Sequence, residues 1–417
     1  MPAGRELAGL PPLPCPNCLM TQVPLPTSQP QPRTDAAPQP GGPPRAAYIH
    51  VPFCRHRCGY CNFTVVAGRD DLVPRFLEAL ERELSALGDP KEVDTLFIGG
   101  GTPTLLEPAD LQRLLAIITA WHPLAAGGEF SLEANPECFD QARAACLAAA
   151  GVNRISLGAQ SFNREKLRRL ERSHTAAEIT RSVELARAAG ASVSLDLIFA
   201  APHETLEDWR ADVQAAVALE PDHISTYGLT FERGTTFWGR LSRGELSQAD
   251  EELERTMYAE GIDLLTAAGF EHYEVSNFAR PSHRCRHNQV YWDAAPYYAA
   301  GPGAARYVNG CRQVNHRSTT TWMKRVLAGQ SPVAESETLP PEDRAREALV
   351  LGLRRIEGVA LDAFAQRFGY SAEALFGAET LQALVDQGLL ACADGRLRLT
   401  REGLFVSDSI WSLVLRC

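Results

Sequence analysis

The chain has 417 residues, of which 45% are apolar and 22% charged, as is typical of a globular protein with two or three modules. Its 41 basic and 51 acidic residues give a formal net charge of -10, which argues against a nucleic-acid-binding protein. The sequence shows neither a signal peptide nor an apolar run long enough to span a membrane, so we expect a cytoplasmic protein. Clustered cysteines in such a protein indicate metal binding or catalysis before disulfides.

The first 46 residues hold 13 of the 28 prolines and lack a regular apolar pattern. Such a segment cannot bury enough apolar surface to offset its loss of entropy, so residues 1–45 are predicted to be a disordered tail. The tail contains Cys15 and Cys18, which supply only two of the four ligands of a structural zinc site. We therefore interpret both as free thiols. An organelle-targeting peptide is the alternative, although the tail is not rich in Arg or Ser.

From residue 46 onward, short apolar strands alternate with helices of regular apolar spacing. The predicted strands lie at 47–51, 95–98, 129–134, 154–158, 192–199 and 223–229. The predicted helices between them lie at 71–87, 107–121, 140–150, 176–189 and 205–219. This alternation predicts an α/β fold with parallel strands and right-handed crossovers. Six units over residues 46–230 fit a partial (β/α)6 barrel better than an eightfold barrel, which takes ~250 residues.

Two further regions follow the predicted barrel. Residues 231–335 are rich in aromatic, Gly and Arg residues and less periodic, so we assign them to an extension of the barrel. Residues 336–417 contain predicted helices at 342–354, 360–367 and 378–388, and then a hairpin around an Asp-Gly turn. Three helices and a hairpin predict a winged-helix-like α+β domain. Because this segment is not strongly basic, a packing or partner role is favoured over DNA binding.

Three cysteines, Cys54, Cys58 and Cys61, lie in the loop after the first predicted strand. Iron–sulfur clusters are held by thiolates, and three thiolates on a four-iron cluster leave one iron open to another ligand. The basic residues between the cysteines would stabilise both the thiolates and the charge of a cluster. The alternative is a zinc site completed by His50 or His56.

Glycine or polar residues interrupt the next strands near their carboxyl ends, where parallel barrels bind ligands. The second strand closes with the run Gly99-Gly100-Gly101-Thr102, which lets the backbone approach a ligand closely. The third, fourth and fifth strands carry Glu133, Gln160 and Asp196. A buried polar side chain needs a partner, which is either a ligand or a local hydrogen bond, and for each residue alone both interpretations stay open.

The CxxxCxxC spacing after a first strand resembles the radical S-adenosylmethionine superfamily. The resemblance implies that Cys54, Cys58 and Cys61 hold a [4Fe-4S] cluster whose fourth iron binds S-adenosylmethionine. It also implies a radical-SAM barrel in which further residues contact S-adenosylmethionine, namely Gly100, Gly101, Thr102, Glu133, Gln160 and Asp196. In that family the cofactors carry the radical chemistry, and the protein supplies position and excludes water.

Residues 46–417 are similar to one branch of that superfamily, which contains the anaerobic coproporphyrinogen III oxidases and the HemW haem chaperones. Tyr48, Tyr60 and Arg172 match cofactor-contacting positions of this branch. Two runs depart from it: Ala200-Ala201-Pro202 stands where the family usually has Gly-Leu-Pro, and Ala305 replaces a histidine. These departures weaken the expectation that the substrate-binding side is the same as in the relatives. They do not affect the residues that match the iron–sulfur cluster and S-adenosylmethionine positions.

Two features favour the haem chaperones over the oxidases. The oxidases carry a fourth cysteine where this chain has Phe63, and the run from His287 to Trp292 matches the HNxxYW signature of the chaperones. The resemblance therefore implies a chaperone that binds haem and passes it to an unidentified acceptor protein. The alternative is an oxygen-independent coproporphyrinogen III oxidase. His287 suits axial haem ligation, but a local bond beside core aromatics also fits. Whether the chain is an enzyme, its oligomeric state and peripheral membrane association stay open.

Overall fold

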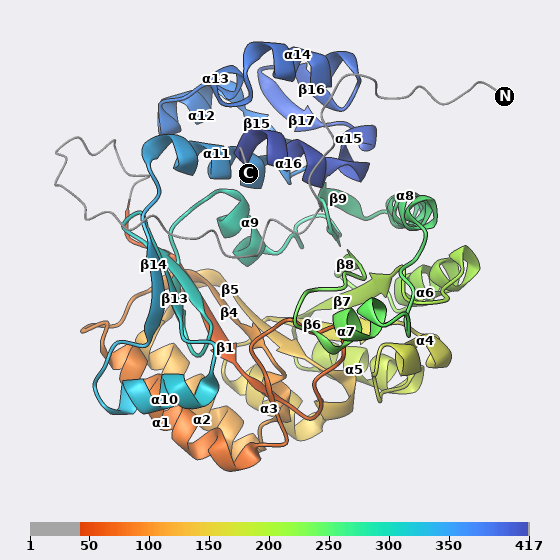
Figure 1. Cartoon of the computed structure of the whole chain (residues 1–417). Coiled ribbons are helices and arrows are strands. Elements are labelled where there is room, and N and C mark those ends of the chain that lie inside the picture. Colours follow the sequence, from red (N-terminus) through yellow and green to blue (C-terminus); the bar gives the residue numbers. More distant parts are fainter. Residues whose placement is uncertain (1–41, 416–417) are drawn as a thin grey trace. The chain divides into compact units, whose positions relative to one another are not determined.

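The computed structural model describes residues 42–415. They form two compact units, which belong to Gly41–Thr338 and to Leu339–Cys417 (Figure 1). The domain boundaries inferred from the sequence stay predictions, and the predicted tail with Cys15 and Cys18 lies almost wholly outside the described residues. Across residues 42–415, every helix is too short or too polar to cross a bilayer.

The larger unit is built on a nine-stranded sheet. The six predicted strands are all present, as β1 (Ala46–Val51), β4 (Val93–Gly100), β5 (Leu124–Ala134), β6 (Arg154–Gln160), β7 (Ser192–Phe199) and β8 (His223–Gly228). They lie side by side in chain order and pair in parallel. The sheet continues with parallel β11 (Tyr298–Ala300) beside β1, and with antiparallel β10 (Asn277–Ala279) and β9 (Glu271–Glu274) beyond β8. The predicted parallel α/β fold is confirmed.

The five predicted helices also connect these strands. They are α1 (Val73–Ser85), α2 (Pro108–Trp121), α3 (Gln141–Ala149), α5 (Ala176–Ala188) and α6 (Leu206–Ala218). Capping boxes begin α5, with Thr175 and Glu178, and α6, with Thr205 and Asp208, so the first N–H groups of each helix are satisfied. Figure 1 shows these helices around one side of the curved sheet.

Other elements of the larger unit were not predicted. They are β2 (Phe53–Cys54), β3 (Val66–Ala67), α4 (Arg164–Arg169), α7 (Thr236–Ser242), α8 (Glu251–Ala267), α9 (Arg286–Trp292) and α10 (Thr319–Leu327). Three short 3-10 helices occur at Asp70–Leu72, Pro103–Leu105 and Pro136–Cys138. The extension also forms an antiparallel sheet of β12 (Ala305–Val308), β13 (Cys311–Asn315) and β14 (Val333–Glu337). Most of these elements are short, so their apolar spacing carries little signal; α8 is the exception, with 17 residues.

The smaller unit contains the three helices and the hairpin predicted for it. These are α11 (Pro341–Leu353), α12 (Leu361–Phe368), α14 (Ala378–Asp386), and β16 (Leu390–Ala393) with β17 (Arg396–Leu399). A two-residue strand, β15 (Val359–Ala360), makes the hairpin a three-stranded sheet. The additional helices are α13 (Ala372–Phe376), α15 (Arg401–Phe405) and α16 (Ser407–Leu415).

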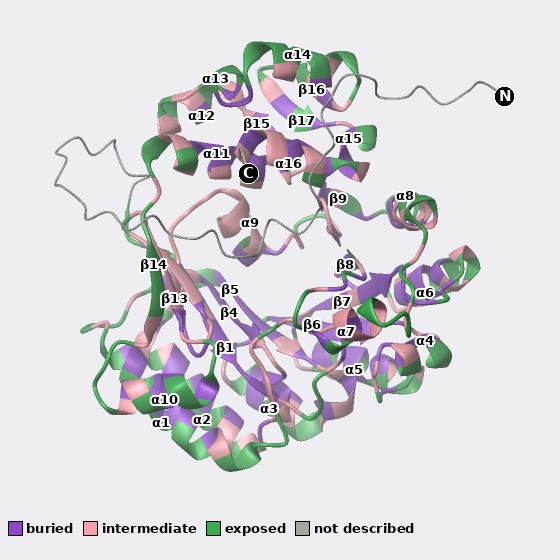
Figure 2. Ribbon diagram, viewed as in Figure 1, coloured by how far each residue is buried: buried purple, intermediate pink, exposed green. Residues whose placement is uncertain are grey.

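The two faces of the larger sheet differ in polarity. On β6, Ile155, Leu157 and Ala159 belong to the apolar core that also includes the surrounding helices. Because side chains alternate along a strand, Arg154 and Ser156 lie on the opposite, inner face. Figure 2 shows the strands buried and the helices exposed on their outer sides. A polar inner face distinguishes this sheet from a barrel whose interior is filled with branched apolar residues.

A buried carboxylate joins α1 to the end of the larger unit. Glu83 accepts hydrogen bonds from the N–H of Gly301 (3.0 Å), from Nδ2 of Asn315 (2.7 Å) and from Nε1 of Trp322 (2.9 Å). Burial raises the pKa of Glu83, although these three donors oppose the shift. The chain segments around β11, β13 and α10 are thus tied to α1 by one side chain.

We expect Glu83→Ala to lower the free energy of unfolding by about 3 kcal/mol, because it leaves three buried donors without their acceptor. Glu83→Gln keeps the shape and one acceptor oxygen, so its loss should be smaller. Chemical denaturation of both variants measures the difference. Equal stability of Glu83→Ala and the wild-type protein would contradict this role.

Candidate functional site

The cysteine loop follows the carboxyl end of β1 and is held in shape by protein contacts. Its three cysteines are half-buried: Cys54, Cys58 and Cys61. The N–H of Gly59 donates to Oε2 of Glu171 (2.7 Å), and its carbonyl accepts from the N–H of Phe237 (2.8 Å). A Cβ on Gly59 would lie 2.3 Å from the Phe237 ring, so a larger residue would displace the loop.

A chain of hydrogen bonds joins Cys54 to Cys58. Oγ1 of Thr102 lies 3.6 Å from Sγ of Cys54 and accepts from Nδ2 of Asn135 at 2.6 Å. Oδ1 of Asn135 accepts from Nη2 of Arg172 at 2.5 Å, and Nη1 of Arg172 donates to Sγ of Cys58 at 3.7 Å. The ends of β4 and β5 and the segment after α4 therefore converge on the cysteine loop.

The surroundings of the thiols fit an iron–sulfur cluster. Burial raises the pKa of Cys54 to about 12, so binding a metal must displace its proton. The charge of Arg172 opposes this shift and thereby favours the thiolate. Within residues 42–415, no three His, Cys, Asp or Glu side chains converge on a point that one ion could occupy. A cluster does not need that convergence, because its cysteines bind separate irons.

The zinc alternative lacks free histidines near the cysteines. Nε2 of His50 lies 2.7 Å from the carbonyl oxygen of Thr64, and its Nδ1 lies 3.1 Å from the hydroxyl of Tyr48. The exposed His56 lies with Nε2 3.4 Å from Oε2 of Glu171. Since a closed zinc site needs a fourth ligand that points at the metal, this geometry favours the cluster.

The glycine run after β4 packs tightly against protein atoms. The N–H of Gly100 donates to Oε2 of Glu133 (2.9 Å), and the N–H groups of Gly101 and Thr102 donate to backbone carbonyls of the β1–β2 segment. A Cβ on Gly100, where φ is +105°, would lie 2.2 Å from the His50 ring. A Cβ on Gly101 would lie 2.6 Å from a backbone carbonyl oxygen. Glycine is therefore required by close packing at both positions.

Charged groups line the inner face behind this run. Burial raises the pKa of Glu133 to about 7; the Asp196 carboxylate adds to the shift, and the Gly100 N–H and Arg154 oppose it. Burial also raises the pKa of Asp196, which accepts hydrogen bonds from Oγ of Ser156 at 3.1 and 3.2 Å. Arg154 is only 6% exposed, and its Nε has no hydrogen-bond partner among the described residues. Perturbed, buried ionisable groups of this kind are typical of functional sites.

Gln160 ends β6 beside the hydrogen-bonded chain of Thr102, Asn135 and Arg172. A Cβ on Gly158 would lie 2.8 Å from Oδ1 of Asn135 and 3.0 Å from Nε2 of Gln160. Nη2 of Arg172 also donates to the Gly158 carbonyl (3.2 Å). The missing side chain of Gly158 thus lets the Gln160 amide reach the polar groups around the cysteine loop.

The two predicted tyrosines lie near the same end of the sheet. Tyr48 contacts His50 through its hydroxyl, and its ring lies 6.2 Å from that of Phe97. Tyr60, between the second and third cysteines, packs its ring edge-on against Phe237 at 6.0 Å. Of the predicted residues, Thr102 and Arg172 contact the cysteines, and Tyr60 lies between two of them. Gly100, Gly101, Glu133 and Gln160 lie at or near the carboxyl ends of their strands, whereas Tyr48 and Asp196 lie further from that end of theirs.

His287 lies at the opposite end of the sheet. The carboxylate of Glu129 accepts the N–H groups of Arg286 (2.8 Å) and His287 (3.0 Å) at the start of α9. Nδ1 of His287 lies 2.9 Å from Oγ1 of Thr95, and Nε2 lies 2.9 Å from the hydroxyl of Tyr291. The side chain is 1% exposed, and burial lowers its pKa to about 3.

Of the two roles predicted for His287, this arrangement favours the local one, and axial ligation of haem stays a prediction. Both ring nitrogens are engaged within the protein, and an axial ligand needs one nitrogen free for iron. The geometry favours the local role, in which the HNxxYW segment closes the amino-terminal end of the sheet.

Sequence reasoning missed three residues of the site: Asn135, Glu171 and Arg154. Asn135 follows Ala134 at the end of β5 and precedes a proline, a position where a polar side chain at a strand end is a usable signal. Glu171 stands beside Arg172 in the same motif. Arg154 opens an otherwise apolar strand, and its burial could be known only from the fold.

The chain is similar to known proteins over most of its length. The sequence model of the Radical SAM superfamily matches residues 48–216, and that of the HemN C-terminal domain matches residues 339–406. "Heme chaperone HemW" of Lactococcus lactis is 35% identical over 373 residues, which cover 89% of this chain and 97% of that protein. The chain belongs to the HemW family of the radical S-adenosylmethionine superfamily. Mouse "Radical S-adenosyl methionine domain-containing protein 1, mitochondrial" is 36% identical over 403 residues, covering 92% of this chain and 91% of its own.

The HemW-family fold also matches a solved structure. Coproporphyrinogen III oxidase (HemN) from Escherichia coli aligns with a TM-score of 0.78 and 23% identity, over 89% of this chain and 90% of that chain. At this identity the match confirms the fold alone. Membership of the superfamily implies a [4Fe-4S] cluster and S-adenosylmethionine as cofactors. The individual contacts predicted for the site residues remain predictions.

We expect Cys58→Ala to lose the brown cluster absorption and the iron of the anaerobically reconstituted protein, because one thiolate ligand is removed. Cys392→Ala is the matched control, since Cys392 is exposed in the smaller unit. Iron analysis and absorption spectra measure both. Retention of about four irons per chain in Cys58→Ala would exclude the predicted ligand set.

Proposed function

We propose that the chain is a haem chaperone that binds haem and transfers it to an acceptor protein, while it carries a [4Fe-4S] cluster and S-adenosylmethionine. The observation that carries this proposal is the similarity to "Heme chaperone HemW" proteins, at 33–38% identity over 76–90% of the chain. Phe63 supports it, because this side chain is 65% exposed beside the cysteine loop where the oxidases have a fourth thiol.

The proposed S-adenosylmethionine site consists of residues near the cysteine loop: Tyr48, Tyr60, Gly100, Gly101, Thr102, Glu133, Gln160, Arg172 and Asp196. S-adenosylmethionine carries an ammonium and a sulfonium charge, to which the buried Glu133 and Asp196 carboxylates are complementary. A [4Fe-4S] cluster held by Cys54, Cys58 and Cys61 would supply an electron for reductive chemistry at the sulfonium. The protein groups orient the ligand and keep water out.

We expect Glu133→Gln to weaken binding of S-adenosylmethionine about tenfold or more, equivalent to ~1.4 kcal/mol, because the charge opposite the ammonium is lost. Wild-type affinity should rise with pH through about 7, as Glu133 ionises, and the variant should lack this dependence. Glu129→Gln is the matched control, because Glu129 is a buried carboxylate on the same strand that caps α9 at the opposite end of the sheet. Isothermal titration measures the affinity of the wild-type protein, Glu133→Gln and Glu129→Gln for S-adenosylmethionine. Unchanged affinity in Glu133→Gln would remove this residue from the site.

Gly100→Val and Gly101→Val are poorer tests of the same site. Their side chains would collide with His50 and with backbone atoms, so a loss of binding would not be separable from misfolding.

We expect the purified chain to bind about one haem per chain and to show no decarboxylation of coproporphyrinogen. Haem titration followed at the Soret band, and product analysis with S-adenosylmethionine present, test the two parts. Decarboxylation with S-adenosylmethionine consumed in step would assign the chain to the oxidases despite Phe63.

The His287 variants decide which role this residue has. His287→Ala should lower thermal stability and leave haem affinity unchanged, because both ring nitrogens make internal contacts. Tyr291→Phe releases Nε2 while keeping the ring, and should likewise leave the Soret band unchanged. A shifted or weakened Soret band in a folded His287→Ala protein would restore His287 as the haem ligand.

We propose a cytoplasmic location and one haem-accepting protein partner. Names of mammalian relatives include the word mitochondrial, so imaging of a fluorescent fusion is the discriminating measurement.

A further inference from the structure

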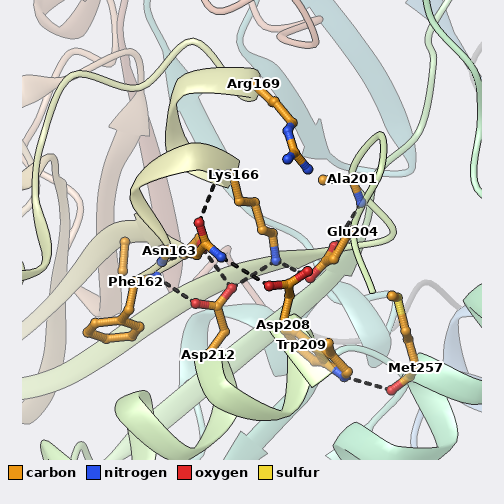
Figure 3. Close-up of polar contacts among 12 residues, drawn as sticks. Phe162, Asn163, Lys166, Arg169, Ala201, Glu204, Asp208, Trp209, Asp212 and Met257 are labelled. Carbon is orange, nitrogen blue, oxygen red and sulfur yellow. Dashed lines mark hydrogen bonds and ion pairs between the residues drawn. The ribbon is translucent and has the colours of Figure 1, made fainter. Parts of the chain in front are cut away.

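Three ionisable side chains form a buried group beside the ends of β6 and β7, which we call the Lys166 cluster: Lys166, Glu204 and Asp212. Nζ of Lys166 lies 2.5 Å from Oε1 of Glu204 and 2.9 Å from Oδ2 of Asp212. The three side chains are 1–2% exposed. Figure 3 shows the lysine reaching from α4 toward the two carboxylates.

The oxygen atoms of the cluster hold the backbone directly after two strands. Oδ1 of Asp212 accepts the N–H of Phe162 (2.7 Å), and Oδ2 accepts the hydroxyl of Ser161 (2.7 Å). Oε2 of Glu204 accepts the N–H of Ala201 (2.9 Å). β6 ends at Gln160 and β7 at Phe199, so the cluster fixes the first turn after each strand (Figure 3).

Both turns begin with a residue in the left-handed region that is not glycine. Gln160 has a φ of +62° and Ala200 a φ of +60°. Residues with a Cβ disfavour this conformation and keep it only where surrounding contacts enforce it. Next to Ala200, Arg169 adds further support, since Nη1 donates to the carbonyls of Pro202 (3.1 Å) and His203 (3.0 Å).

A contribution to the stability of the fold does not by itself explain the Lys166 cluster. A buried ion pair gains little net free energy over apolar residues of the same volume, because all of its members are desolvated. Such a group does, however, restrict its neighbours to the one geometry that satisfies every polar atom. The backbone that it restricts leads directly to Gln160, whose amide lies among the polar groups around the cysteine loop.

We propose that Lys166, Glu204 and Asp212 are positioning residues that hold the ends of β6 and β7 so that Gln160 stays in the conformation that faces the S-adenosylmethionine site. This inference rests on the proposed function, because it takes Gln160 as part of that site. In this proposal Lys166, Glu204 and Asp212 do not themselves contact S-adenosylmethionine.

The test compares Lys166→Met, which keeps the length of the side chain and removes its charge, with the wild-type protein. Isothermal titration with S-adenosylmethionine on the reconstituted proteins should show at least about a tenfold loss of affinity, with iron content unchanged. Amide hydrogen exchange is measured on both proteins without the iron–sulfur cluster. Exchange at Phe162 and Ala201 should be faster in Lys166→Met than in the wild-type protein. Arg346→Met is the matched control, because Arg346 is a buried cation of the smaller unit that bonds Glu342 and two backbone carbonyls.

The outcomes separate this inference from the proposed function. If the wild-type protein does not bind S-adenosylmethionine, the proposed site fails. The amide exchange rates of Phe162 and Ala201 then still decide whether the Lys166 cluster holds the two turns. If Lys166→Met binds as tightly as the wild type, or exchange at both amides is unchanged, the positioning role is overturned. If Lys166→Met does not fold, Asp212→Asn, which keeps the side-chain shape, takes its place under the same criteria. Weakened affinity in Arg346→Met as well would reduce the effect to general destabilisation and likewise overturn the proposal.

Discussion

The guanidinium of Arg172 is the centre on which the carboxyl end of the sheet depends. It donates to Sγ of Cys58, Oδ1 of Asn135 and the Gly158 carbonyl, and it lies 3.8 Å from Glu137. Burial opposes ionisation of Glu137, but the hydrogen bond with His174 and the charge of Arg172 lower its pKa to about 2. Because one buried cation serves the cysteine loop and two strand ends, these segments cannot move independently.

The two ends of the same sheet are built for different purposes. At the carboxyl end, side chains from successive strands and loops bond to one another around the three cysteines. At the amino end, Glu129 caps α9, and His287 is locked between Thr95 and Tyr291. This division follows the rule for parallel barrels, in which the carboxyl ends of the strands carry function and the amino ends carry stability.

Buried charge recurs along the inner and outer sides of β5, β6 and β7. On the inner face, the charge of Arg154 opposes the rise in the pKa of Glu133 and Asp196. On the helix side, the carboxylates of the Lys166 cluster accept backbone N–H groups just after β6 and β7. Since buried ions add little net stability, the proposed role of the Lys166 cluster is to define backbone geometry, whereas Arg154 places a positive charge near two carboxylates.

The sequence alone determined the six parallel strands, the five connecting helices and the cysteine motif, because apolar periodicity and cysteine spacing are local properties of the chain. It also determined the family, and it drew attention to polar residues of the strands such as Glu133 and Gln160. The tertiary structure alone decided that Asn135 and Glu171 support the cysteine loop, and that Lys166 lies beside Glu204 and Asp212. It also decided that His287 is closed off by Thr95 and Tyr291, because a hydrogen bond depends on which residues, distant in the chain, the fold brings within 3 Å.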